Sequence, residues 1–455
     1  MLFNSLHFLL FFVSLFFGYY LVPERFRRWV LLLASCYFYM VYVPAYILIL
    51  FFLIVTDFLL GLRMGNAEGK KRKWLLIISI FLNLGTLFLF KYFNFFNENI
   101  SALAQLLHWH YPEVVLRIAL PIGLSFHVFQ SLSYVIEVYR GKVEPERDLG
   151  RYALYVLFFS QLVAGPIERP QHFLPQLRQD HPFQASNVRK GLEIMLLGFF
   201  KKLVIADNLA LIVDHIYGKG METNGFVLFI AAFAFTYQLY CDFSGYSDIA
   251  VGSAQVFGYD LTNNFRRPFA SRSIAEFWRR WHTSLSNWLR DYLYNPLVFS
   301  GERLSKIRIY LSLLVTFTLI GLWHGANWTY IAMGMLHGVY LVLSLVTADV
   351  RKRIITAIGL SKFPRLHQAW QTLVVFVLVT VSFVLFRAVS LPQAGQVLRG
   401  MFYAPLELFS FVPQWRAWLT PAGIGVGLKT VLFLLVAIGC LEWIQYVQEK
   451  KNTPF

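Results

Sequence analysis

The stretch Ile309–Trp328, IYLSLLVTFTLIGLWHGANW, contains an apolar run long enough to enter a membrane deeply. It follows the basic segment Lys306–Arg308 and carries no charged residue. Since a helix rises about 1.5 Å per residue, His324 would lie roughly 22 Å from the start of this run. That distance passes the midplane of a hydrocarbon core about 30 Å thick. The stretch therefore predicts an integral membrane protein with a histidine at membrane depth.

The composition of the whole chain supports this prediction. Of its 455 residues, 57% are hydrophobic, 18% aromatic and only 15% charged, and the mean hydropathy is +0.54. Soluble domains carry about 25% charged residues. The sequence therefore predicts an all-α, polytopic membrane protein. We interpret the net charge of +16 as basic cytoplasmic loops, in part as an entrance that attracts an anionic donor, and not as a nucleic-acid surface.

Hydrophobic segments along the chain predict about ten to twelve transmembrane helices. The chain has no repeat of fixed period and no low-complexity linker, which favours a single integral-membrane domain, 1–455. We divide it into N-terminal spans (1–113), a motif-bearing core (114–390) and a C-terminal loop and span (391–455). The candidate spans are 2–22, 29–43, 46–62, 74–93, 114–137, 152–164, 192–216, 224–241, 305–322, 326–347, 371–388 and 424–446.

Basic loops alternate with loops that lack Lys and Arg, and this alternation predicts the orientation of the chain. The loops Pro23–Arg28, Gly69–Lys73 and Arg140–Arg151 are basic, whereas Asn94–Pro112 contains neither Lys nor Arg. Because basic loops stay in the cytoplasm, the N-terminus is expected on the opposite side. The first apolar segment lacks the flanks of a cleaved signal peptide, so we interpret it as a first span.

A second polar and aromatic stretch, SRSIAEFWRRWHTSLSNWLRDYLYNP, runs from Ser271 to Pro296. Ser273 and Glu276 fit a capping box that starts a helix, and Pro296 is expected to end it. Its apolar face would carry His282 at its margin. This pattern alone is typical of an interfacial helix in which the histidine is incidental. The predicted apolar face comprises Ile274, Phe277, Trp278, Trp281, Leu285, Trp288, Leu289 and Tyr292.

His324 suggests a chemical use for this region. A histidine at membrane depth is by default a functional hypothesis, although it also occurs as a hydrogen bond between helices. A neutral imidazole near pH 7 can take a proton from a hydroxyl as that hydroxyl attacks a thioester or ester. No nucleophile elbow, P-loop or dinucleotide-binding motif is present, and Cys36, Cys241 and Cys440 lack metal-ligand spacing. Acyl transfer therefore fits better than phosphoryl transfer or redox chemistry.

Six blocks in order along the chain resemble the membrane-bound O-acyltransferase family, in particular its bacterial alginate O-acetyltransferase branch. The resemblance covers roughly residues 120–390 and includes the motifs RRWHTSLS around His282 and LWHG around His324. The six blocks are Leu120–Gly141, Gln161–Pro170, Tyr240–Gly252, Asn263–Leu297, Gly321–Gly338 and Phe383–Ala388.

The resemblance implies a ring of tilted spans in the bacterial inner membrane, with a re-entrant or amphipathic funnel on the cytoplasmic side. It implies His324 and His282 as catalytic residues and a cytoplasmic thioester donor, acetyl-CoA or an acyl carrier protein, as substrate. It further implies no tightly bound cofactor or metal, contact with membrane lipids, and an extracytoplasmic acetyltransferase- or esterase-like partner. Candidate residues for binding the donor or acceptor are Trp278, Arg279, Arg280, Asn287, Arg290, Asp242, Ser247, Trp323 and Asn327.

The function expected on these grounds is O-acetylation of an exported cell-envelope polysaccharide, and two alternatives stay open. D-alanyl transfer to teichoic acid from a carrier protein, a sister activity in the family, is one. The segment NPLVFSGERLS after Tyr294 lacks the paired glycines usual in this branch, which leaves the donor and the polysaccharide pathway open. A transporter of polysaccharide or of a lipid-linked precursor is the other. It would need a carboxylate relay within the spans, and Asp57 is the clear mid-span carboxylate of the N-terminal half.

Overall fold

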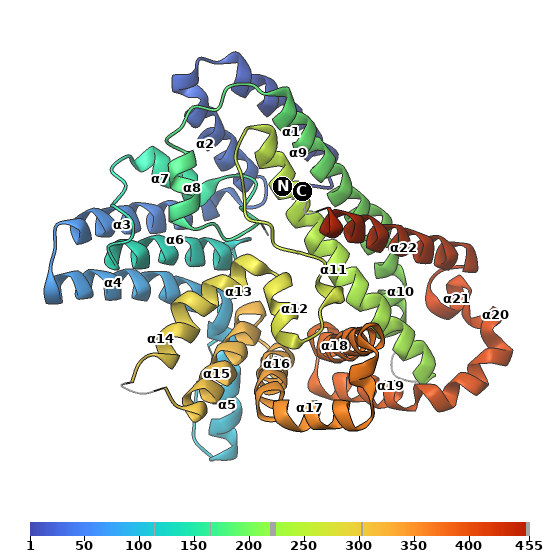
Figure 1. Ribbon diagram of the computed structural model, residues 1–455. Coiled ribbons are helices and arrows are strands. Elements are labelled where there is room, and N and C mark those ends of the chain that lie inside the picture. The colour runs from blue at the N-terminus through green and yellow to red at the C-terminus, as the bar shows by residue number, and fades with distance from the viewer. Residues whose placement is uncertain (113, 164, 219–223, 302–303, 452–455) are drawn as a thin grey trace. The chain divides into compact units, whose positions relative to one another are not determined.

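The computed structural model describes residues 1–112, 114–163, 165–218, 224–301 and 304–451. Within these ranges the regular elements are helices and no strand occurs, which confirms the all-α prediction (Figure 1). The chain forms two compact units. Unit 1 comprises 1–196 and 246–263, and unit 2 comprises 197–245 and 264–455. The single domain 1–455, its divisions and the ring of spans stay predictions.

Unit 1 is built from the N-terminal helices, with α3, α4 and α6 packed side by side (Figure 1). A buried polar cluster joins two of them. Ser79 Oγ and Asn83 Nδ2 on α4 donate to the carboxylate of Asp57 on α3, at 2.6 and 2.8 Å. The helices are α1 (Leu6–Leu21), α2 (Glu24–Met40), α3 (Ile47–Gly65), α4 (Gly69–Leu87), α5 (Phe93–Leu106), α6 (Leu124–Tyr139), α7 (Leu149–Leu157), α8 (Pro170–Gln176) and most of α9 (Ala185–Phe199).

Unit 2 contains the rest of the chain, and its closest helix pair is the hairpin of α15 and α16. Glycines permit this contact, because a Cβ atom on Gly321 would clash with the carbonyl of Tyr330. The elements are the π-helix η3 (Phe200–Ala206), α10 (Asp207–Gly218), most of α11 (Gly225–Val256), α12 (Ile274–Arg280), α13 (Thr283–Leu289), the π-helix η5 (Arg290–Tyr294), α14 (Asn295–Val298), α15 (Lys306–His324), α16 (Trp328–Val346), α17 (Ala348–Ala357), α18 (Pro364–Arg387), α19 (Leu391–Phe411), α20 (Trp415–Trp418), α21 (Pro421–Ile424) and α22 (Leu428–Lys450).

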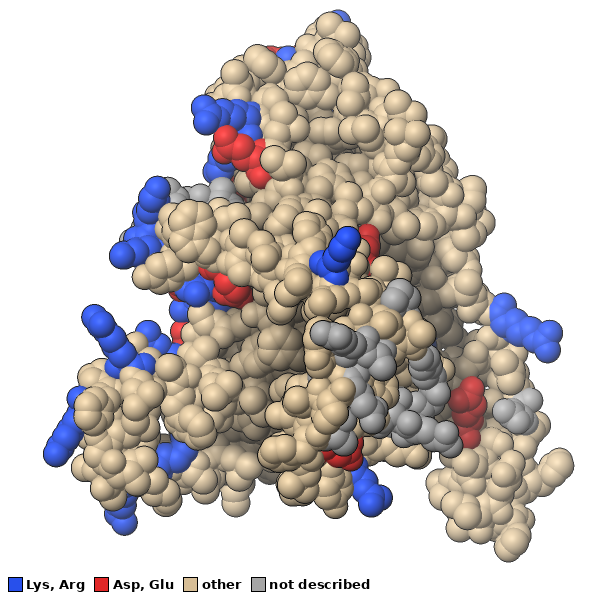
Figure 2. Space-filling view, turned by 90° about the vertical axis from the view of Figure 1, so that its right-hand side faces the viewer, with Lys and Arg blue, Asp and Glu red and all other residues tan. Residues whose placement is uncertain are grey.

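In the described part of the chain, seven helices are long and apolar enough to cross a membrane, and α1 is a shorter apolar helix. Charged side chains are accordingly few on the face shown in Figure 2. The described helices are thus those of a protein that crosses the membrane several times. The seven helices are Pro44–Gly65, Gly69–Leu106, Gly225–Val256, Lys306–His324, Trp328–Val346, Pro364–Arg387 and Leu428–Lys450.

Seven is fewer than the ten to twelve spans expected, and two segments show the reason. Segment 114–137 is helical only from Leu124, because Gly123 has a left-handed backbone with φ 75°. Segment 152–164 yields only α7, which ends at Leu157. Residues 152–157 of α7 are all buried within unit 1, so their hydrophobicity reflects packing against protein rather than contact with lipid.

The predicted single helix over 273–296 is wrong, because it breaks at His282. Helix α12 ends at Arg280, and α13 begins at Thr283. One of the two hydrogen bonds of the predicted capping box is confirmed, and the other is not. Ser273 Oγ caps Glu276 N at 3.1 Å, but the carboxylate of Glu276 accepts from Arg272 N rather than from Ser273 N.

Pro296 does not end this helical region either. The chain continues from α13 through the wide π-helical turn η5 into α14, and Pro296 lies in the first turn of α14. The missing N–H of a proline is tolerated in a first turn. The predicted apolar face is confirmed as buried from Ile274 through Leu289, whereas Tyr292 is partly exposed.

Candidate active site

The break between α12 and α13 gives His282 a left-handed backbone, with φ 45° and ψ 55°. Such a conformation costs a residue other than glycine roughly 1–2 kcal/mol. Two backbone hydrogen bonds from a nearby segment hold it. Arg266 N donates to Arg280 O at 2.9 Å, and Thr283 N donates to Asn264 O at 3.0 Å. We call residues 264–266 the clamp.

Asn264 also replaces the cap that α13 lacks. His282 is the N-cap residue of α13, but its side chain caps nothing. Ser284 N instead donates to Asn264 Oδ1 at 3.2 Å. Because this acceptor comes from a remote segment of the chain, the orientation of α13 depends on tertiary structure and not on its own sequence.

The imidazole of His282 lies in an aromatic cage with only 1% of its surface exposed. Its ring lies 4.7 Å from that of Phe243 on α11 and 6.1 Å from that of Trp323 on α15. His282 lies outside the seven apolar spans. Burial lowers its pKa well below the usual value, and the nearby His324 lowers it further. His282 is therefore a neutral imidazole at pH 7.

His324 follows Trp323 at the end of α15, and both predicted catalytic histidines lie near the Trp323 ring in unit 2. The rings of His324 and Trp323 are 5.1 Å apart, and Phe386 of α18 lies 5.4 Å from His324. His324 is the last residue of α15 and is partly exposed. A partly exposed imidazole at a helix end can contact a substrate, whereas the neutral His282 nearby is buried. We call His282, Trp323 and His324 the histidine cluster.

Trp278 joins α12, the helix before His282, to α16. Its Nε1 donates to Nδ1 of His337 on α16 at 3.3 Å, and both side chains are buried. Phe277 stacks on the same imidazole with ring planes 4° apart. These contacts fix α12 against α16. They indicate that Trp278 positions the helix that precedes His282.

Several of the charged residues proposed to bind the donor are engaged in ion pairs. Arg280 contacts Glu276 at 2.9 Å and Glu449 at 2.6 Å. Arg290 pairs with its neighbour Asp291, and Asp242 pairs with Lys202 at 2.6 Å.

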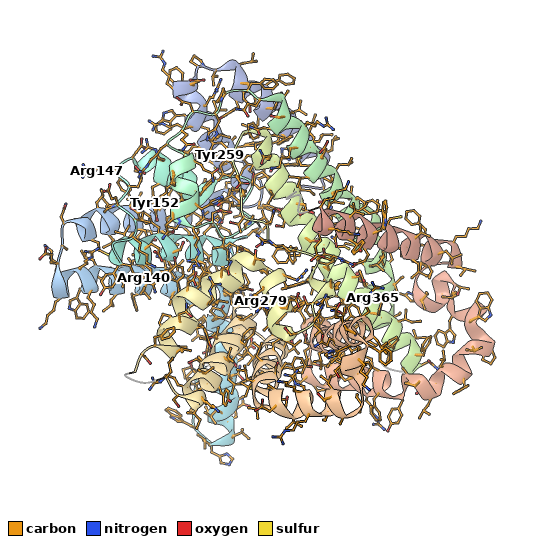
Figure 3. All side chains as sticks on the ribbon, in the orientation of Figure 1. Arg140, Arg147, Tyr152, Tyr259, Arg279 and Arg365 are labelled. Atoms are coloured by element: carbon orange, nitrogen blue, oxygen red, sulfur yellow. The ribbon has the colours of Figure 1, made fainter. Side chains whose placement is uncertain are left out.

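The remaining candidates differ in their surroundings. Arg279 is exposed on α12 (Figure 3), and Asn287 is partly exposed on α13. Asn327 caps α16 by accepting from Thr329 N at 3.0 Å. Ser247 belongs to unit 1, whereas the histidine cluster belongs to unit 2. A role for any of these residues in binding the donor stays a prediction.

In the structure His172 lies between two carboxylates. Its Nδ1 lies 2.7 Å from Glu168 Oε2, and its Nε2 lies 3.6 Å from Asp260 Oδ2. Hydrogen bonds to Asp260 and Glu168 raise its pKa to about 10. We call these three residues the latch. Glu168 precedes His172 by four residues, so the sequence could have predicted their contact on one face of a helix. Asp260 is distant in sequence, and no local pattern could have predicted its contact with His172.

Two other observations bear on the chemistry. Asp57 is the carboxylate that the transporter hypothesis would need as a relay. It is fully buried and accepts hydrogen bonds from Ser79 and Asn83, as expected of a group that joins helices. In the described ranges, no three His, Cys, Asp or Glu residues are grouped as metal ligands. The expectation of no metal stays a prediction.

Comparison with known proteins assigns the chain to a family. A family model described as membrane-bound O-acyltransferase matches residues 122–389, which include both histidines. The chain belongs to this family. It is therefore a multi-pass membrane protein and an O-acyltransferase.

Its relatives fall into groups that differ in how much of the chain they cover. A "probable alginate O-acetylase" of Pseudomonas aeruginosa is 38% identical over 445 residues, 96% of this acyltransferase and 81% of the relative. A peptidoglycan O-acetyltransferase of Helicobacter pylori is 32% identical and covers 88% and 80%. A teichoic acid D-alanyltransferase of Streptococcus thermophilus is 28% identical and covers 49% and 56%.

Proposed function

We propose that this acyltransferase O-acetylates an exported cell-envelope polysaccharide in the bacterial cytoplasmic membrane, with its N-terminus outside. The relatives that act on polysaccharide by O-acetylation match nearly the whole chain. The D-alanyltransferase relative matches only about half of it. The observation that carries the proposal is the histidine cluster, in which a caged neutral imidazole stands beside a partly exposed one.

His324 acts as the general base in the proposed reaction. Its neutral imidazole takes the proton of the acceptor hydroxyl while the oxygen attacks the carbonyl carbon of an acetyl thioester. The C–S bond then breaks, and the imidazolium returns the proton to the departing thiolate, so the histidine is neutral again. The donor is acetyl-CoA or an acetylated carrier protein on the cytoplasmic side. The hydroxyl acetylated in this step belongs to an intermediate acceptor, from which an extracytoplasmic acetyltransferase- or esterase-like protein transfers the acetyl group to a hydroxyl of the polysaccharide.

His282 takes the donor side in this scheme and supports His324. Because its pKa is lowered, it does not compete for the proton that His324 accepts. Two neighbouring imidazoles that were both charged would repel each other, and the burial of His282 removes that cost. The ring of Trp323 packs against both imidazoles, at 6.1 Å from His282 and 5.1 Å from His324.

The test is transfer of labelled acetyl from acetyl-CoA by purified protein, with and without the extracytoplasmic partner. His324→Ala should lower the transfer rate by about 10²–10⁴-fold. His110→Ala, which removes an exposed loop histidine, is the matched control and should leave the rate unchanged. Transfer unaffected by His324→Ala in folded protein would falsify the assignment. A carrier protein loaded with D-alanine, offered as the donor in the same assay, tests the alternative reaction.

A further inference from the structure

Unit 2 contains a groove of about 460 Å³ at one end of α16 and α18, a volume in the range of small-molecule sites. Helix α17 lies between the ends of these two helices (Figure 1), and its Arg351, Ile354 and Ile355 line the groove. The start of α12 forms another wall. The groove is lined by Arg272, Ser273, Ile274, Tyr340, Leu343, Ser344, Thr347, Arg351, Ile354, Ile355, Ile358, Leu360, His367, Trp370, Gln371, Val374, Val375 and Leu378.

The lining changes from polar to apolar along the axis of α18. Arg351 and His367 lie near the points where the apolar spans 328–346 and 364–387 end. Val374 and Leu378 line the groove further along the same span. From His367 to Leu378 a helix rises roughly 16 Å, about the depth of one leaflet of the hydrocarbon core. The groove therefore runs from the membrane surface into one leaflet.

Charge at the polar end favours an anion. The basic lining residues are Arg272, Arg351 and His367, and none of the described lining residues is acidic. Arg351 is held over the last turn of α16, where its Nη2 donates to Ser344 O at 2.5 Å. The carboxylate of Glu276 is near, but it accepts from the backbone N of Arg272.

The surrounding segment adds positive charge. It carries Lys352, Arg353, Lys362 and Arg365, against the single acid Asp349 between residues 348 and 365. Arg365 is labelled in Figure 3. Clusters of basic residues next to a membrane span attract anionic lipid head groups.

Helix α17 has the pattern of a helix that lies in the membrane surface. Val350, Ile354 and Ile358 form a stripe at four-residue spacing, with 55%, 53% and 66% of their surface exposed. Trp370 on α18 is likewise 57% exposed, as is typical of an aromatic side chain at the head-group level. Both observations place the mouth of the groove at the lipid–water boundary.

We infer that this groove binds an anionic glycerophospholipid, with its phosphate between Arg272 and Arg351 and one acyl chain along Val374 and Leu378. A free phosphate or the phosphates of coenzyme A would use the arginines but not the apolar depth. The site is separate from the histidine cluster, and the inference does not depend on the proposed reaction. The start of α12 is part of the groove wall, so the bound lipid also steadies the helix that ends beside His282.

The experiment is native mass spectrometry of detergent-purified protein mixed with phosphatidylglycerol or with phosphatidylcholine of the same chains. Wild-type protein should retain phosphatidylglycerol at least tenfold more strongly. Arg351→Ala should abolish most of this preference, whereas Lys352→Ala, which removes the same charge from α17 outside the groove lining, should keep it. Equal losses in the two variants, or equal retention of the two lipids by wild type, would overturn the inference.

The apolar depth is tested separately. Val374→Trp fills the groove and should lower retention of phosphatidylglycerol at least fivefold, whereas Val377→Trp, on the exposed face of the same helix, should not. This pair keeps the inference testable if Arg351→Ala fails to fold. Release of phosphatidylglycerol by added coenzyme A would assign the groove to the phosphates of the donor instead and overturn the lipid assignment.

Discussion

His172 in unit 1 and His282 in unit 2 are the same side chain in opposite surroundings. His172 lies between two carboxylates with 42% of its side chain exposed, and its pKa rises to about 10. His282 lies between two aromatic rings with 1% exposure, and its pKa falls well below the usual value. At pH 7 the first is therefore a cation that binds two segments together, and the second is a neutral imidazole.

The backbone conformations of the two histidines also differ. His172 is part of the regular helix α8, whereas His282 has a left-handed conformation that the clamp maintains. Sparsely populated conformations that persist through surrounding contacts occur preferentially at functional sites. A satisfied, charged histidine in a regular helix is a stabilising group. A desolvated histidine at a strained position is a candidate for chemistry.

The largest expected effect comes from His282→Asn. Asparagine tolerates the left-handed conformation, so the break between α12 and α13 should persist without the imidazole. We expect the acetyl transfer rate to fall about 10²–10⁴-fold, while the melting temperature stays close to that of the wild type. Transfer assays and thermal melts on one preparation measure both. A variant with full activity would mean that only the backbone shape of this residue matters, and the contrast with His172 would disappear.

His172→Gln should have the opposite signature. The variant leaves the buried carboxylate of Glu168 without its charged partner, and a loss of about 1 kcal/mol is expected after allowance for the exposure of His172. The transfer rate per folded molecule should stay unchanged. Denaturation of the purified variant gives the first quantity, and the labelled-donor assay gives the second. A large loss of activity at unchanged stability would place His172 in the reaction.

The smallest effect is the pH dependence of the latch. The pKa of His172 is raised from 6.5 to about 10 on folding, so its stabilising contribution is complete below pH 6.5 and is lost as the pH rises towards 10. The difference in melting temperature between wild type and His172→Gln should therefore shrink from pH 6.5 to pH 10. Melts across this range measure it. A constant difference would show that the imidazole acts through packing alone.

The sequence predicts the parts of this structure that depend on local pattern. The apolar run after Lys306 does form a helix that ends at His324, and Ser273 does cap a helix. The break at His282 was not predictable, because Trp281 and His282 fit the helical period and the deciding hydrogen bonds come from Asn264 and Arg266. Burial of α7 was missed for a related reason, since an apolar segment looks the same whether protein or lipid covers it.

Three residues of chain, 261–263, separate Asp260 of the latch from the start of the clamp at Asn264. Glu168 of the latch also accepts a hydrogen bond from Thr262 N at 2.5 Å, and the clamp begins at Asn264. Only Asn263 lies between Thr262 and Asn264. We expect an insertion or deletion at this point to disturb the hydrogen bonds by which the clamp holds the backbone on either side of His282. We expect variation in chain length to be selected against in this linker, although no residue of the linker takes part in the proposed chemistry.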